Sequence, residues 1–348
     1  MKILITGNLG YVGSELVKEL RKKYPDAILI GYDIGFFSSQ LINRIFAPEI
    51  YIDQQIYGDV REFPENILEK VDTVVQLAAI SNDPIGNKFE SVTLEVNHKS
   101  VIDIAEKARK KGVKNMVFAS SCSVYGFAEE AARSETSEVN PLTAYAKSKV
   151  RAENDLKQLA GDNFKVTCLR FATACGISDR LRLDLVLNDF VAGALASKEI
   201  TILSDGTPWR PLINVKDMAR AIIWAHERDN SNGGNFLIVN TGSNQWNYQV
   251  KDLAYAINKI LPEISVSVNK DAQPDKRSYK VNFDKFRSLA PENQPVYDLK
   301  TTITELINGL ANIKFKDKNF RQSRLVRLFV VNELLEKGIL DNNLRLIK

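Results

Sequence analysis

The chain has few of the residues that build metal centres and disulfide frameworks. Its 348 residues include only three cysteines and two histidines. Cys122, Cys168 and Cys175 lack the spacing of metal ligands, and a reducing compartment would keep them as thiols. His98 and His226 stand alone within helical patterns, without a partner for metal binding or nucleophilic catalysis. We therefore expect no metal site.

Long apolar runs and blocks of like charge are also missing. No segment approaches the roughly 20 consecutive apolar residues that a membrane-spanning helix needs. The chain starts directly with a strand pattern, Met1-Lys2-Ile3-Leu4-Ile5, rather than with a signal peptide. Its 47 basic and 43 acidic residues are spread out and give a formal charge of +4 at pH 7. These features predict a cytoplasmic protein that binds neither a membrane nor a nucleic acid.

What is present is the composition of a packed globular protein, with 44% hydrophobic residues. In the first half, short β-branched runs alternate with amphipathic helical stretches, which is typical of an α/β protein with a Rossmann-type, doubly wound parallel sheet. The expected strands are 2–6, 27–32, 72–77, 115–119 and 165–171, and the expected crossover helices are 14–23 and 98–111.

The pattern loosens after about residue 176 into helices and short extended pieces, which predicts a second, smaller lobe. A further strand at 236–240 is able to return to the first sheet, so the lobes interleave in sequence. The tail 316–348 is rich in charge and has a helical pattern, and it docks either on the body or on a partner chain. We expect a Rossmann domain and a mixed α/β substrate-binding lobe, made of residues 1–175 and 215–245 and of residues 176–214 and 246–348, respectively.

A glycine-rich turn follows the first expected strand. The sequence Thr6-Gly7-Asn8-Leu9-Gly10-Tyr11-Val12-Gly13-Ser14 leads at once into a helical pattern. Such glycines permit a tight turn, let the backbone approach a pyrophosphate and leave that anion at the positive end of the helix dipole. Because any strand-to-helix turn can collect glycines, the spacing alone predicts only a phosphate-binding turn, formed by Gly7, Gly10, Tyr11, Val12 and Gly13.

The second expected strand ends at Asp33. A carboxylate there can accept hydrogen bonds from the hydroxyls of an adenosine ribose, whereas the extra phosphate of NADP would meet the same negative charge. No arginine follows immediately to neutralise that phosphate. Alternatively, Asp33 merely begins a turn. The order strand, glycine turn, helix, strand and acid favours an NAD site.

A tyrosine and a lysine lie on one face of a later helical segment. Tyr145 and Lys149 are four residues apart in it. An ammonium group close to a phenol stabilises the phenolate, so we expect Lys149 to lower the pKa of Tyr145 from about 10 towards the working pH. Ser121 follows the fourth expected strand, at the sheet edge where such folds place ligands. Each pattern also occurs by chance, in surface helices and in loops.

Together, these residues resemble the extended short-chain dehydrogenase/reductase family, and within it the NAD-dependent nucleotide-sugar epimerases and dehydratases. The resemblance implies that Tyr145 removes a proton from a sugar hydroxyl, usually at C4, while a hydride passes to the nicotinamide. It also implies that Lys149 holds the nicotinamide ribose and that Ser121 hydrogen-bonds the reacting oxygen. Besides Tyr145 and Lys149, the implied cofactor contacts of this part of the chain are Asp59, Val60, Leu77, Ala78, Ala79 and Asn97.

Segments 182–190 and 206–217 look like those that border the sugar-nucleotide site in this family. The implied substrate contacts are Ser81, Ser123, Thr173, Asn188, Arg210 and Arg277. The last three match positions that bind the diphosphate, and a planar guanidinium suits phosphate oxygens. Arg180 or Arg182 could take the same role.

Two departures from the family pattern narrow the chemistry. The 4,6-dehydratases carry Asp-Glu directly after the catalytic hydroxyl, where this chain has Cys122 and Ser123, so dehydration is disfavoured. Thr173 stands where an asparagine usually meets the substrate, which puts the family's usual substrate pose in question.

The leading hypothesis is an NAD-dependent epimerase of a nucleotide-diphosphate sugar. It would oxidise the sugar at C4, reposition the transient 4-keto sugar and return the hydride to the opposite face, in the synthesis of polysaccharide or glycoconjugate precursors. A net oxidoreductase acting on the same class of substrate is the first alternative, and a non-catalytic NAD sensor is the second. The resemblance also implies a homodimer, formed by the helix that carries Tyr145 and by its neighbour.

Overall fold

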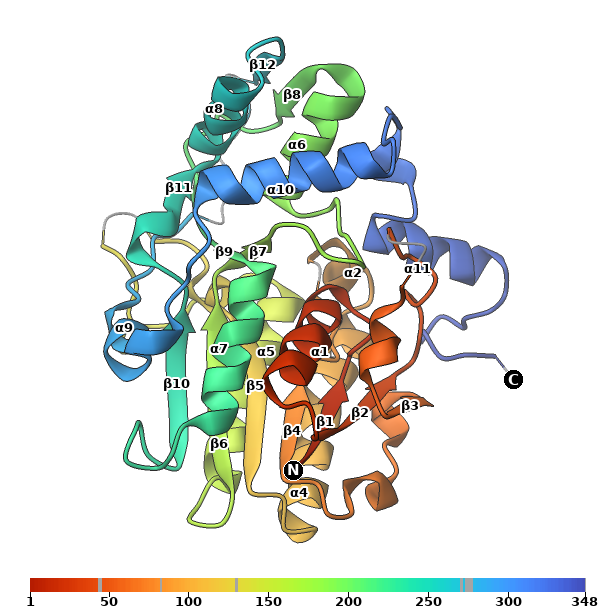
Figure 1. The fold of residues 1–348 in the computed structure, drawn as a ribbon, viewed down its shortest axis with the longest axis vertical. Helices are drawn as coiled ribbons and strands as arrows, with labels where there is room; N and C mark the ends of the chain where they lie inside the picture. Colours follow the sequence, from red (N-terminus) through yellow and green to blue (C-terminus); the bar gives the residue numbers. More distant parts are fainter. Residues whose placement is uncertain (43–45, 82, 129–130, 270–271, 273–277, 348) are drawn as a thin grey trace.

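A seven-stranded parallel sheet forms the centre of the protein (Figure 1). The computed structural model describes residues 1–42, 46–81, 83–128, 131–269, 272 and 278–347. The strand order is β10-β6-β5-β4-β1-β2-β3, which confirms the predicted doubly wound sheet and the late strand that returns to it. The strands are β1 (Lys2–Thr6), β2 (Ile28–Asp33), β3 (Gln54–Tyr57), β4 (Thr73–Gln76), β5 (Asn115–Ser121), β6 (Lys165–Phe171) and β10 (Phe236–Thr241).

The inner strands are apolar on both faces, because helices cover both sides of the sheet. In β1, Ile3 and Ile5 belong to the core on one face, whereas Leu4 belongs to the core on the other. The main covering helices are α1 (Tyr11–Lys23) and α7 (Val215–Glu227) on the first face, and α4 (Ser100–Lys110) and α5 (Ala144–Leu159) on the second.

The edge strand β3 was not predicted. Its sequence, Gln54-Gln55-Ile56-Tyr57, has no apolar run, because the strand lies at the edge of the sheet and pairs there with β2. Backbone hydrogen bonds to β2, which side-chain patterns do not report, therefore give this segment its structure.

The second half of the chain adds two small sheets and several helices. One sheet is mixed, since β9 pairs parallel with β7 and antiparallel with β11, and the other joins β8 to β12. In the described part of the chain, no helix is long and apolar enough to cross a membrane. The strands are β7 (Thr173–Cys175), β8 (Glu199–Ile202), β9 (Trp209–Asn214), β11 (Asn247–Gln249) and β12 (Ser265–Val268), and the helices are α6 (Val186–Ser197), α8 (Val250–Ile260), α9 (Asp284–Leu289) and α10 (Leu299–Asn312).

The C-terminal tail docks on the body of the chain, one of the two arrangements expected for it. Its helix α11 (Arg327–Glu336) lies beside the loop that follows β2 (Figure 1). The tail packs on the short helices α2 (Asp83–Lys88) and α3 (Glu90–Leu94) of the first domain, although we placed it in the second lobe. The buried residues of this contact are Ile85, Val92, Val331, Leu340 and Leu344.

Candidate active site

A cavity of about 700 Å³ lies at the carboxyl ends of the central strands. Its lining includes Gly7 after β1, Asp33 at the end of β2, Leu77 after β4 and Ser121 at the end of β5. Open parallel sheets bind their ligands at this edge, where the loops after neighbouring strands diverge. The cavity is therefore the candidate active site.

The cavity brings together most of the residues that the sequence suggested. Three of the predicted residues do not appear in its lining: Asn97 and Asn188 are engaged elsewhere, and Arg277 lies outside the described residues. The predicted residues that line the cavity are Gly7, Gly10, Tyr11, Val12, Gly13, Asp33, Asp59, Val60, Leu77, Ala78, Ala79, Ser81, Ser121, Ser123, Tyr145, Lys149, Thr173 and Arg210.

Two glycines of the turn lie where a side chain would collide with neighbouring backbone. Gly7 has a φ of +75°, and a Cβ atom there would lie 2.5 Å from the backbone nitrogen of Ala78. A Cβ atom on Gly13 would lie 2.5 Å from the Cα atom of Asn8. The turn ends at Gly10, which has no side chain to cap α1, so the N–H groups of the first helical turn are left for a ligand. These donors and the helix dipole suit a pyrophosphate.

Asp33 presents a half-buried carboxylate beside this turn. One oxygen accepts a hydrogen bond from the backbone N–H of Leu9 at 3.1 Å, and the other accepts one from the N–H of Gly35 at 2.8 Å. Burial raises the pKa of Asp33 above its usual value, and the two hydrogen bonds oppose this effect. Each oxygen keeps a further lone pair for the hydroxyls of a ribose.

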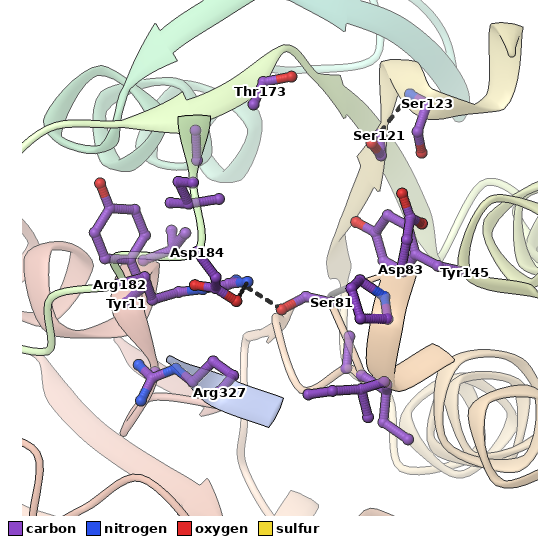
Figure 2. A pocket seen from close by; sticks show the side chains of 18 of the residues that line it. Tyr11, Ser81, Asp83, Ser121, Ser123, Tyr145, Thr173, Arg182, Asp184 and Arg327 are labelled. Carbon is purple, nitrogen blue, oxygen red and sulfur yellow. Dashed lines mark hydrogen bonds and ion pairs between the residues drawn. The ribbon is translucent and has the colours of Figure 1, made fainter. Parts of the chain in front are cut away.

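Tyr145 and Lys149 project from the first turns of α5 towards β5. The Nζ atom of Lys149 donates a hydrogen bond to the carbonyl oxygen of Ala119 at 2.7 Å and lies 5.5 Å from the centre of the Tyr145 ring. The Ser121 side chain acts on Tyr145 and lowers its pKa, against the larger effect of burial. Figure 2 shows Ser121, Ser123 and Tyr145 converging on one side of the cavity. The phenol of Tyr145, which can act as an acid or a base, and the hydroxyl of Ser121 thus face the same part of the cavity.

The prediction that Lys149 lowers the pKa of Tyr145 was wrong for the protein alone. Burial raises the pKa of Tyr145 to about 12 and lowers the pKa of Lys149 to about 7. Both shifts have the same cause, because removal from water disfavours the charged form of either group. The Lys149 amine also points to Ala119, so it does not offset the desolvation of the phenol.

Two predicted ligand contacts instead hold loops in place. The Asn97 side chain accepts a hydrogen bond from the N–H of Ile80 at 2.8 Å and donates one to its carbonyl oxygen at 2.9 Å. The Asn188 side chain accepts one from the N–H of Gly176 at 2.9 Å and donates one to the carbonyl oxygen of Arg182 at 2.9 Å. Asn97 therefore fixes the loop after β4, and Asn188 fixes the segment that leads into α6.

Other lining residues were missed or left without a role. Asp83 lies next to Tyr145 (Figure 2), and its charge contributes to the raised pKa of the phenol. Arg182 pairs with Asp184 at 2.9 Å and donates a hydrogen bond to Ser81 at 2.9 Å, so it connects the two lobes across the cavity. Within the described ranges, no group of three or more His, Cys, Asp or Glu residues could hold a metal ion.

The fold and the cavity define a redox protein that uses a dinucleotide and in which the hydroxyl of Tyr145 serves as the acid or base. The chain belongs to the NAD dependent epimerase/dehydratase family, whose model matches residues 3–242. It is 32% identical over 235 residues to an uncharacterised UDP-glucose epimerase, YtcB, of Bacillus subtilis, covering 64% of this chain and 71% of the relative. It is 26% identical over 290 residues to the UDP-glucose 4-epimerase of the same organism, covering 75% and 82%. A solved UDP-glucuronic acid 4-epimerase from Bacillus cereus, in complex with UDP-glucuronic acid and NAD, has the same fold, with a TM-score of 0.75, 22% identity and coverage of 90% of this chain and all of that one.

Proposed function

We propose that the protein epimerises a nucleotide-activated sugar through a transient 4-keto sugar, with NAD as cofactor. The observation that carries this proposal is the convergence of Ser121, Tyr145 and Lys149 on one cavity that also contains the glycine turn and Asp33. The names of the relatives, which include UDP-glucose 4-epimerases, support it.

The glycine turn and Asp33 would hold the diphosphate and the adenosine ribose of NAD. When bound, NAD supplies the group that accepts a hydride from a sugar carbon and gives it back. Val60, Leu77 and Ala78 provide apolar wall for its rings, and they line the same cavity. The side chains of the protein then have to transfer the proton of the sugar hydroxyl and hold the oxygen of that hydroxyl in place.

Tyr145 takes the proton of the sugar hydroxyl when the carbon is oxidised and returns it when the carbonyl is reduced. Ser121, which lines the cavity together with Tyr145, holds the reacting oxygen at that point. Lys149 lies one helical turn further along α5, with its Nζ atom 5.5 Å from the centre of the Tyr145 ring, and its protonated form would stabilise the phenolate. Because the same groups serve both half-reactions, the sugar has only to present its other face for the configuration to invert.

A 4,6-dehydratase is disfavoured by the residues after Ser121. Cys122 is fully buried, its sulfur contacts the carbonyl oxygen of Arg170, and burial raises the pKa of its thiol. It therefore supplies no acid to the cavity. Ser123 does line the cavity, but a hydroxyl is a poor base for removing a proton from carbon.

The second lobe, residues 176–214 and most of 246–348, would bind the nucleotide. Arg210 of β9 reaches the cavity wall, and Arg182 lies opposite Ser81. Thr173 also lines the cavity. A diphosphate between the lobes would meet these guanidinium groups.

The decisive experiment follows both the cofactor and the sugar. Purified protein is incubated with UDP-, ADP-, GDP- and dTDP-sugars, and absorbance near 340 nm is recorded while product stereochemistry is determined by NMR. An epimerase interconverts two sugars without net change in NADH. Stoichiometric accumulation or consumption of NADH would instead establish the net oxidoreductase, which uses the same half-reaction.

Tyr145→Phe tests the assignment of the base. We expect the rate to fall by about 10²–10⁴, the usual contribution of a positioned acid or base. The variant should keep its melting temperature, since only a hydroxyl is removed. Full activity of Tyr145→Phe would remove the catalytic assignment, and full NAD binding without turnover in the wild type would support the sensor.

We also propose a cytoplasmic homodimer. The three cysteines are free thiols, which suits a reducing compartment. The dimer follows from the resemblance, which pairs α4 and α5 with their copies, and light scattering after gel filtration measures it. A monomeric mass at working concentration would reject it.

A further inference from the structure

The C-terminal segment reaches the same cavity as the glycine turn. Arg327, Val331 and Leu344 line it together with Asp33 and Asp59. The family match ends before this segment, so the segment is not among the features that identify the family. Figure 1 shows α11 against the loop that follows β2, at the end of the sheet opposite to β10.

Arg61 connects this segment to the wall of the cavity. Its guanidinium forms an ion pair with Asp59 and donates hydrogen bonds to the carbonyl oxygens of Asn343 at 2.7 Å and Leu344 at 3.0 Å. Asp59 is one of the cofactor contacts that the family resemblance implies. The position of Leu344 and the position of that carboxylate are therefore fixed by one side chain.

Arg327 brings a buried positive charge to the same wall. It is 3% exposed, donates hydrogen bonds to the Gln40 side chain at 2.5 Å and to the carbonyl oxygen of Arg180 at 3.2 Å, and lies 4.0 Å from the centre of the Phe37 ring. Among the described residues, no carboxylate forms an ion pair with it. Burial lowers its pKa to about 9; the nearby charges of Arg182 and Arg180 act in the same direction, and those of Asp184 and Asp33 oppose them.

Among the described residues, the carboxylates nearest to Arg327 have other partners: Asp184 pairs with Arg182, and Asp33 accepts hydrogen bonds from the N–H groups of Leu9 and Gly35. Arg180 is paired with Glu49 at 2.7 Å, and Arg182 is paired with Asp184 at 2.9 Å, so those two cations are already compensated. Burying a cation without a paired anion is unfavourable unless a ligand supplies the charge. A diphosphate bound at the start of α1 would bring that negative charge into the same cavity.

We propose that the segment from Arg327 to Leu344 is part of the NAD site. Arg327 contributes positive charge towards the diphosphate, and Leu344, fixed to Asp59 through Arg61, closes the adenosine end. The segment thereby keeps NAD bound from one turnover to the next. This inference rests on the proposed NAD-dependent function, and it suits an epimerase, because such an enzyme consumes no NAD.

The test measures cofactor retention rather than activity alone. Wild type, Arg327→Gln, Arg327→Lys and a chain that ends at Val326 are purified by gel filtration, and bound NAD per chain is determined after denaturation. The exchange of bound NAD for an excess of isotope-labelled NAD is then followed. We expect Arg327→Gln and the shortened chain to lose NAD about tenfold faster or more, since about 1.4 kcal/mol of binding free energy corresponds to a factor of ten.

Arg324→Gln is the matched control. It removes the same charge three residues before the segment, but Arg324 is half exposed, pairs with Glu333 and does not line the cavity. It should exchange NAD at the wild-type rate, and Arg327→Lys should recover part of the loss. In Arg327→Gln, the NAD concentration that gives half-maximal activity should rise by a larger factor than the rate at saturating NAD falls.

Each result decides the proposal. Wild-type exchange in Arg327→Gln overturns it, whether or not the shortened chain folds, and equal loss in Arg324→Gln overturns it as well. If the wild type binds no NAD, the proposed function fails with it. If the wild type binds NAD, and Arg327→Gln and the shortened chain exchange it at the wild-type rate, this inference fails but the proposed function stands.

Discussion

Tyr145 and Lys149 carry opposite pKa shifts within one turn of α5. Burial raises the pKa of Tyr145 to about 12 and lowers that of Lys149 to about 7. At a pH between these two values, the two side chains together hold one proton that can leave. The form with a phenolate and an ammonium is then a constant fraction of the total. We therefore expect kcat/KM to rise as the pH increases through about 7, where the first proton leaves, and to stay level above it. A profile of rate against pH at saturating NAD measures this.

Lys149→Met shows the pH dependence of Tyr145 without the amine. Without the amine, Tyr145 has to lose its own proton, whose pKa is about 12, so the rate should keep rising with pH throughout the alkaline range. Near pH 8 the rate should be lower than in the wild type, because no positive charge remains beside the phenolate. Lys149→Arg is the control that keeps a positive charge at this place. A level profile in Lys149→Met would show that the lysine does not share the proton.

At the scale of elements, a buried ion pair fixes α5 against the sheet. Arg170 of β6 donates to the two carboxylate oxygens of Glu153 at 2.9 and 2.6 Å, and Ser120 of β5 donates to the same carboxylate at 2.5 Å. We expect Arg170→Met to lower the free energy of unfolding by about 3–5 kcal/mol, because it leaves the Glu153 charge buried without a partner. Urea unfolding measures this loss.

The double variant Arg170→Met with Glu153→Leu gives the corresponding check. Replacing both charges by apolar groups should recover much of the lost stability, since no unpaired charge remains. If the single variant is as stable as the wild type, the pair does not hold α5, and another contact must position Tyr145 and Lys149.

The elements differ in how far the sequence predicts them. Inner strands and covering helices were predictable because their apolar periodicity reflects burial on the sheet, whereas β3 depends on backbone pairing. Among site residues, Gly7 and Ser121 follow strand ends and have local signals. Asn188 was given to the ligand because a motif does not show that its amide already holds Gly176 and Arg182. Arg327 reaches the cavity from the far end of the chain, so its neighbours in sequence carry no sign of it.

At the scale of the whole molecule, the cavity joins the two lobes. Its lining includes Ser121 and Tyr145 of the first domain and Phe190 and Arg210 of the second lobe. A nucleotide bound between them should stabilise the protein as one unit. We expect at least one of UDP, ADP, GDP and dTDP to raise the melting temperature, because a ligand at 100 times its Kd adds about 2.7 kcal/mol to the free energy of unfolding.

Arg210→Gln shows whether that stabilisation comes from the second lobe. Arg210 lines the cavity, whereas Lys259 on α8 is exposed and outside it, so Lys259→Gln removes a like charge as the control. Loss of a charge-assisted hydrogen bond costs about 1.5–3 kcal/mol, which weakens nucleotide binding by roughly 10- to 100-fold. The melting-temperature shift with the nucleotide should therefore shrink in Arg210→Gln alone, while the shift with NAD stays. If both shifts shrink together, Arg210 supports the fold of the cavity, and the diphosphate has to be held by Arg182 instead.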